Sequence, residues 1–211
     1  MEPGLRERKK ERTRQSIADA AIAMFLARGF DAVSTADVAA AVEVSKPTLF
    51  RYFPTKEDLV VHRFADHLDE PARVVRERAA GETPLAALLR HFRAGLDAHD
   101  PVTGLCDDPE VLAFHRLVFE TPGLTARLAE IDARGTAALA EALARAVSVD
   151  ASTLRPRLLA AQVLAVWRVL ARANWAVLAA GSTAAAAHRE AVAAAADAFG
   201  LLGAGAASSG Y

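Results

Sequence analysis

The sequence contains a single cysteine, Cys106, which excludes an intramolecular disulfide. An isolated cysteine also provides no metal-ligand spacing, so we expect neither a metal site nor a cofactor. Runs of alternating β-branched and aromatic residues are nearly absent, which argues against strands. Alanine, leucine, arginine and glutamate are abundant instead, and 53% of the residues are hydrophobic, enough for a buried core. These proportions predict an all-α fold.

Long uninterrupted hydrophobic runs are missing as well. The most apolar stretch covers residues 158–181, and four polar residues interrupt it: Gln162, Arg168, Arg172 and Asn174. Polar groups at these central positions favour a buried helix over a membrane span, so we expect no membrane partner. The N-terminus lacks the pattern of an export signal, and we expect a cytoplasmic protein.

Motifs typical of catalysis are also absent from the sequence. It contains no glycine-rich phosphate loop, no nucleophile elbow and no His-Glu-His metal pattern. Acidic residues near position 108 are explained by helix capping. We therefore do not expect an enzyme.

The net charge of -1 is divided unevenly along the chain. Residues 1–56 hold ten Lys and Arg against seven Asp and Glu, a net charge of +3, whereas residues 57–211 hold 15 against 19, a net charge of -4. Six basic residues form an arm that leads into the first expected helix: Arg6, Arg8, Lys9, Lys10, Arg12 and Arg14. Such an arm attracts polyanions through counterion release, although most charged runs are simply solvated.

Hydrophobic spacing predicts a first helix over residues 13–28. Gly29 can end this helix in the left-handed conformation, and Phe30 can then pack back on Phe25. Ser34 and a carboxylate three residues later have the spacing of a capping box, which predicts a second, short helix.

A third helix is predicted directly after a short turn at residues 43–44. Ser45 can cap this helix, residues 46–52, and Pro47 falls in its first turn, where a missing N–H costs little. Two short helices joined by a tight turn are typical of a helix-turn-helix. An ordinary three-helix bundle is the alternative.

The outward face of this third helix has side chains that suit DNA. Lys46 and the nearby Lys56 can meet phosphates, and Tyr52 can donate a hydrogen bond to one. Thr48 can touch a base edge or a thymine methyl group. Arg51 can contact either a phosphate or a base.

Residues 10–63 contain, in order, Arg-Thr-Arg-Gln, Ala-Met-Phe, Arg-Gly-Phe and Ser-Lys-Pro-Thr-Leu-Phe-Arg-Tyr-Phe-Pro-Thr-Lys-Glu-Asp-Leu. This order resembles the DNA-binding domain of the tetracycline-repressor (TetR) family. The resemblance implies a homodimer whose recognition helices enter adjacent major grooves of a palindromic, double-stranded operator. It also implies a C-terminal domain that binds a small-molecule effector and thereby releases the DNA.

Three positions depart from the family pattern. Glu43 stands where the family usually has glycine, and a non-glycine residue in a left-handed turn costs about 1 kcal/mol. Phe50 replaces a tyrosine, so we expect it to contact sugar or a thymine methyl group. Ala36 replaces an arginine of some relatives, which leaves Thr35 as the expected polar contact. The resulting set of expected DNA-binding residues is Thr35, Lys46, Pro47, Thr48, Phe50, Arg51, Tyr52 and Lys56.

Beyond the helix-turn-helix the spacing predicts six further helices. Their expected ranges are 55–80, with Pro71 able to kink it, 85–98, 109–120, 124–147, 152–181 and 183–202. Residues 97–107 are expected to form a loop, and residues 203–211 a disordered tail. We therefore expect a DNA-binding domain over residues 1–56 and a ligand-binding and dimerisation domain over residues 57–202.

Aromatic and polar residues of these later helices are candidates for an effector pocket. The candidates are Phe92, Phe114, His115, Phe119, Trp167 and Asn174. Aromatic residues at helical spacing more often belong to a core, and His115 is equally explained as a core histidine. Residues 50–141 also resemble a subgroup of regulators with an acyl-CoA-like ligand-binding domain, which implies a small hydrophobic or acyl-type effector.

The expected helix over residues 152–181 has two apolar faces. The first face consists of Val163, Trp167, Leu170, Asn174 and Leu178, and the second consists of Leu159, Gln162, Val166, Val169 and Val177. Because two apolar faces require two neighbours, we expect the second face to contact something outside its own subunit. With the alanine-rich helix over residues 183–202, this helix resembles the pair that forms the four-helix dimer interface of the family.

Taken together, these patterns and the family resemblance imply a homodimeric, ligand-responsive transcriptional repressor. Two alternatives stay open. One is a regulator that activates transcription, and the other is a ligand-binding or architectural dimer that does not repress.

Overall fold

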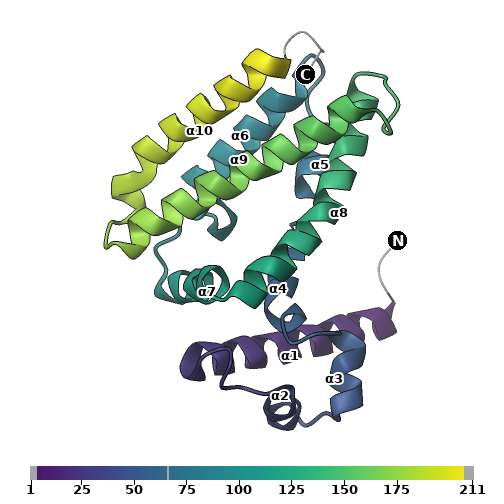
Figure 1. Cartoon of the computed structure of the whole chain (residues 1–211), viewed down its shortest axis with the longest axis vertical. Helices are drawn as coiled ribbons and strands as arrows, with labels where there is room; N and C mark the ends of the chain where they lie inside the picture. The colour runs from purple at the N-terminus through teal and green to yellow at the C-terminus, as the bar shows by residue number, and fades with distance from the viewer. Residues whose placement is uncertain (1–3, 66, 207–211) are drawn as a thin grey trace. The chain divides into compact units, whose positions relative to one another are not determined.

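The computed structural model describes residues 4–65 and 67–206, which form ten α-helices, one 3₁₀ turn and no strand (Figure 1). The prediction of an all-α fold is confirmed. The chain divides into two compact units. The first comprises residues up to Ala65 together with Ala113–Ala129, and the second comprises the remaining described residues.

Four helices lie in the N-terminal part of the first unit: α1 (Leu5–Arg28), α2 (Thr35–Ala41), α3 (Lys46–Tyr52) and α4 (Asp58–Ala65). Their core includes side chains that are at most 1% exposed, among them Ile17, Phe25, Leu49, Phe53 and Leu59. The helix-turn-helix prediction for α2 and α3 is confirmed in position and length.

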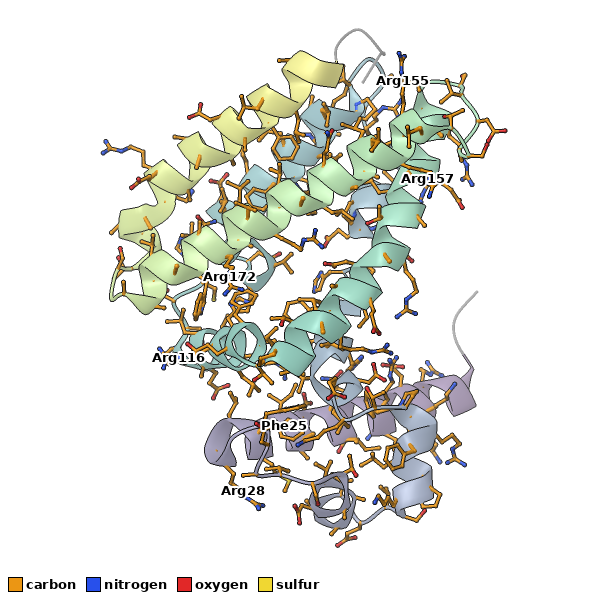
Figure 2. All side chains as sticks on the ribbon, viewed as in Figure 1. Phe25, Arg28, Arg116, Arg155, Arg157 and Arg172 are labelled. Atoms are coloured by element: carbon orange, nitrogen blue, oxygen red, sulfur yellow. The ribbon has the colours of Figure 1, made fainter. Side chains whose placement is uncertain are left out.

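The end of α1 follows the predicted geometry. Gly29 has a φ of 87°, and its N–H donates to the carbonyl of Phe25 at 2.8 Å. Phe30 then packs on Phe25, with ring centroids 5.0 Å apart. Arg28, in the last turn, is exposed and points away from this core (Figure 2).

The beginning of α1 differs from the prediction. The helix was expected from residue 13 but begins at Leu5, so most of the basic arm is helical. Arginine and lysine are good helix formers, and the arm contains neither glycine nor proline from Leu5 onward.

The single helix expected over residues 55–80 is wrong. The structure has two helices there, α4 and α5 (Glu70–Arg76), with Pro71 in the first turn of α5. Proline lacks an N–H and its ring clashes with the preceding turn, so Pro71 begins a new helix and does not kink an existing one.

The C-terminal helices are α6 (Pro84–Asp97), α7 (Pro109–Glu120), α8 (Pro122–Ala146), α9 (Leu154–Ala179) and α10 (Ala184–Ala206). The boundary between the two units falls within α7 and within α8. In the second unit α10 packs along α9 and α6 (Figure 1). Within the expected loop lies the 3₁₀ turn η1, Pro101–Thr103.

Helix α10 continues four residues past its expected end at Leu202. The added residues 203–206 are Gly-Ala-Gly-Ala, so alanine, the strongest helix former, alternates there with glycine, one of the weakest, and helix propensity does not explain the extension. The remainder of the expected disordered tail, residues 207–211, lies outside the described residues.

Candidate nucleic-acid interface and effector residues

Side-chain caps hold the helix-turn-helix in place. Ser34 caps α2: its hydroxyl accepts from the Asp37 N–H at 3.1 Å, and the Asp37 carboxylate accepts from the Ser34 N–H at 2.8 Å. The bond from the Ser34 backbone, followed by that from its hydroxyl, holds the pKa of Asp37 below its usual value. Ser45 caps α3 by accepting from the Thr48 N–H at 3.2 Å. Both predicted caps are therefore confirmed.

The turn between α2 and α3 contains one residue in the left-handed region. Glu43 has a φ of 54°, as the family pattern of glycine at this position implies. The turn is closed by the N–H of Val44, which donates to the carbonyl of Ala39 at 3.0 Å. Ala39 is almost fully buried, and its small side chain allows α2 and α3 to approach closely.

Most of the expected DNA-binding residues lie together on the outside of α3. Four of them are exposed: Lys46, Pro47, Phe50 and Arg51. Thr48 and Tyr52 are half-buried on the same helix, and Thr35 is half-buried at the start of α2. The Thr48 hydroxyl shares a hydrogen bond of 2.8 Å with that of Ser45, which fixes its direction but leaves capacity for a second bond. Their contact with DNA stays a prediction.

Lys56 has partners inside its own unit. Its ammonium nitrogen donates to the carbonyl of Phe30 at 2.5 Å and lies 4.2 Å from the centroid of the Phe30 ring. The centroid of the Phe25 ring lies 5.5 Å from the same Lys56 nitrogen. These contacts join the start of α4 to the end of α1, a structural role that sequence reasoning missed because Phe30 is 26 residues away.

Helix α4 is also held by residues from α7 and α8 of the same unit. Arg127 donates through Nε to the Asp58 carboxylate at 2.8 Å, and Asp58 also accepts from the Thr55 N–H at 3.0 Å. Near the other end of α4, the Phe64 and Phe114 rings stack at 5.7 Å. Sequence patterns gave no signal for this ion pair, because 69 residues separate its partners.

Three of the effector candidates lie together in the first unit. His115 is 5% exposed, and its ring stacks on Phe119 at 5.5 Å and lies 6.2 Å from Phe114. Its Nδ1 is buried with no hydrogen-bond partner among the described residues. Burial lowers the pKa of His115, so the imidazole is neutral at pH 7.

The other three effector candidates lie in the second unit. Trp167 packs against His91 and Phe92, at centroid distances of 5.9 and 5.7 Å. Its indole N–H is buried and has no hydrogen-bond partner in the described part of the chain. Asn174 is 8% exposed and donates through Nδ2 to the carbonyl of Thr103 at 2.9 Å, so its amide already supports η1.

The expected dimer-interface residues divide into two groups. Leu159 is 6% exposed and belongs to the core of the second unit, and Val166 packs against this core. Gln162, Val169 and Val177 are exposed on α9, with Val169 at 68%. Sequence periodicity placed all five on one face and missed three exposed leucines of α9 and α10: Leu154, Leu158 and Leu201.

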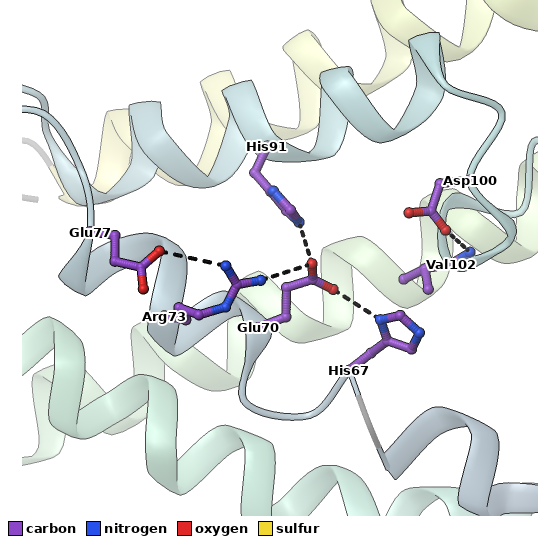
Figure 3. A network of polar contacts seen from close by, with 7 residues as sticks. All are labelled: His67, Glu70, Arg73, Glu77, His91, Asp100 and Val102. Atoms are coloured by element: carbon purple, nitrogen blue, oxygen red, sulfur yellow. Dashed lines mark hydrogen bonds and ion pairs between the residues drawn. The ribbon is translucent and has the colours of Figure 1, made fainter. Parts of the chain in front are cut away.

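A polar network joins α5 to α6 in the second unit (Figure 3). Glu70 is its centre: the carboxylate accepts from Arg73 at 3.4 Å and lies 3.1 Å from the His67 ring and 3.4 Å from the His91 ring. Arg73 also pairs with Glu77 at 3.5 Å. The network holds the His91 ring, and that ring stacks on Trp167.

Neither a metal centre nor a membrane span is found among the described residues. They contain no group of three or more His, Cys, Asp or Glu side chains placed to hold a metal ion. They also contain no helix that is long and apolar enough to cross a membrane.

Comparisons with known proteins connect this geometry to a family. Residues 17–62, which include α2 and α3, match the model of the bacterial regulatory proteins of the tetR family. The chain is 37% identical over 173 residues to the HTH-type transcriptional regulator TcmR of Streptomyces glaucescens, covering 81% of this chain and 76% of TcmR. The chain therefore belongs to the tetR family of transcription regulators, which bind DNA through a helix-turn-helix.

A second relative and a solved structure agree with this assignment. The chain is 33% identical over 113 residues to the HTH-type transcriptional repressor LfrR of Mycolicibacterium smegmatis, covering 53% of this chain and 58% of LfrR. The structure of FadR from Bacillus subtilis in complex with stearoyl-CoA has the same fold, with a TM-score of 0.53 and 16% identity. That match covers 86% of this chain and 96% of FadR.

Proposed function

We propose that this protein is a homodimeric transcriptional repressor that binds a palindromic operator and is released from it by a small-molecule effector. The observation that carries the proposal is the exposed face of α3, where polar and aromatic side chains lie on a helix capped and buried as a recognition helix requires. The relative LfrR, a transcriptional repressor by name, favours repression over activation. A repressor works on chromosomal DNA, so the proposal includes a cytoplasmic location.

The dimer is proposed from the exposed apolar side chains of α9 and α10. Val169, Val177 and Leu201 are 68%, 48% and 81% exposed, respectively. Large apolar side chains exposed on one helix pair are typical of an interface, and a second copy of the same pair can cover them around a two-fold axis. The two copies of α3 would then read two half-sites, about 34 to 36 Å apart.

The effector is proposed to be small and hydrophobic or of acyl type. Phe92 and Trp167 provide apolar ring surface, and the unpaired indole N–H of Trp167 is a donor for a ligand oxygen. FadR, which shares the fold, was solved with stearoyl-CoA. Membership of an acyl-CoA-binding subgroup stays a prediction.

The experiment that tests operator binding begins with DNA fragments selected by the purified protein from a random library. Thr48→Ala removes the proposed base contact, and we expect it to cost about 1 to 3 kcal/mol at one position of each half-site and to relax the preference there. The base preference at all other positions of the half-site should be unchanged. A uniform loss over all sequences would show that Thr48 contacts only the backbone, and selection of no common sequence would contradict operator binding.

A further inference from the structure

The positive charge of the N-terminal region lies outside the part that matches the family. Residues 17–62 hold four Lys and Arg against six Asp and Glu, a net charge of -2. Residues 5–16, directly before them, hold six against two, a net charge of +4. Protein binding to DNA draws its sequence-independent attraction from cations that neutralise phosphates and release counterions. The matched domain alone therefore has little of that attraction.

The structure makes residues 5–16, which we name the basic extension, the first turns of α1. Twelve residues of α-helix are about 18 Å long. The helix continues into Ile17 and Ala18, which are 1% and 0% exposed, so the basic extension is continuous with a helix that packs in the core of the first unit. Arg8, Lys9 and Arg12 are exposed and make no ion pair within the described part of the chain.

The basic extension ends beside the proposed recognition helix. The guanidinium carbon of Arg14 lies 5.6 Å from the centroid of the Phe53 ring, and Phe53 is the residue that follows α3. In Figure 1 the N-terminal half of α1, in purple, passes close to one end of α3. A duplex that receives α3 in its major groove therefore presents its phosphates close to the basic extension.

We propose that the basic extension is a second DNA contact of this protein, which binds the sugar-phosphate backbone beside α3 and supplies the attraction that residues 17–62 lack. This inference rests on the proposed operator binding. Lysine and arginine bind phosphate oxygens through charge-assisted hydrogen bonds without reading the bases. The basic extension thus sets affinity, whereas α3 sets sequence preference.

The test compares salt dependence in the full-length protein. In the variant Arg8→Gln/Lys9→Gln/Arg12→Gln, glutamine keeps a high helix propensity and removes three positive charges. Binding to a selected fragment and to a scrambled duplex is titrated by fluorescence anisotropy between about 0.05 and 0.3 M salt. We expect the slope of log K against log salt to decrease by about 0.9 for each phosphate that the variant no longer neutralises, and both DNAs to lose affinity by the same factor.

Two control variants separate this contact from net charge and from folding. Arg76→Gln/Arg93→Gln/Arg134→Gln removes the same charge from exposed arginines of α5, α6 and α8, and should keep the wild-type slope. Arg8→Lys/Arg12→Lys retains the charge of the basic extension and should also show the wild-type slope. Circular dichroism of all variants should show unchanged helix content.

The outcomes distinguish the inference from the proposed function. If no fragment is selected, operator binding itself fails. If a fragment is selected but the glutamine variant keeps the wild-type slope, or loses no more than the control, the basic extension does not contact DNA. An unchanged DNA slope with lost binding to vesicles of anionic phospholipid would assign the basic extension to a membrane surface and overturn the proposal.

Discussion

Among single residues, Glu43 combines a left-handed backbone with a side chain that disfavours it. Its φ of 54° brings the Cβ close to the backbone, which costs about 1 kcal/mol for a residue other than glycine. We predict that Glu43→Gly raises the free energy of unfolding by up to about 1 kcal/mol in urea titrations. Glu43→Ala keeps the Cβ and serves as the matched control, with no gain expected. An equal gain in both variants would mean that the acidic group, and not the backbone, is the source.

His115 links stability to pH through its burial. Because burial lowers the pKa of this imidazole below 6.5 in the folded chain, the unfolded chain binds a proton at a pH where the folded chain does not. Stability should therefore fall as the pH decreases below about 6.5 and be independent of this group above that value. We predict that His115→Phe, which keeps an aromatic ring against Phe119, shows a smaller loss between pH 7.5 and 5.5 in thermal unfolding. Identical pH profiles would contradict this assignment.

At the scale of elements, the segment between α6 and α7 depends on side chains of α9. Asn174 donates to the Thr103 carbonyl, and Gly104, with a φ of 73°, lies so close to the Ala171 backbone that a Cβ would overlap it. Asp107 continues this attachment by accepting from the N–H of Ala184 at 2.9 Å. The segment is thus held from both ends of the α9–α10 connection.

Because Asn174 bonds to Thr103, a substitution at Asn174 affects the stability of the segment between α6 and α7. We predict that Asn174→Leu, which leaves the Thr103 carbonyl without a donor, lowers the free energy of unfolding by about 1 to 3 kcal/mol. Hydrogen exchange should increase for the amides of residues 100–105, while the amides of α2 and α3 should be unaffected. Unchanged stability in this variant would show that the amide is free to serve an effector instead.

At the scale of the whole molecule, the dimer determines whether two copies of α3 can read one operator. A charge at a buried position such as Leu159 would disrupt the protomer itself, so the exposed Val169 is the sharper site. We predict that Val169→Asp shifts sedimentation toward monomers and weakens operator binding at low protein concentration, with an unchanged circular dichroism spectrum. Val149→Asp is the matched control, since Val149 is 45% exposed but lies outside α9 and α10. An intact dimer in the Val169 variant would place the interface elsewhere.

Much of the fold was predictable because its determinants are local. Ser34 and Ser45 cap helices through residues three positions away, and Gly29 ends α1 by the conformational freedom of one residue. Apolar spacing then identified most of the remaining helices. The prediction failed at Pro71, where the expected kink is the start of a new helix, and at Leu5, where helix propensity extends α1 beyond its apolar face.

The sequence by itself determined the all-α class, the helix-turn-helix and the family resemblance, because caps, turns and hydrophobic periods act over a few residues. Only the tertiary structure decided the partners of side chains far apart in the chain. Lys56, expected at a phosphate, bonds to Phe30, and Asn174, expected at an effector, bonds to Thr103. The spacing of residues along the sequence indicates which helix face each residue occupies. A hydrogen bond, however, requires two groups within about 3 Å, and that distance is set by the path of the whole chain.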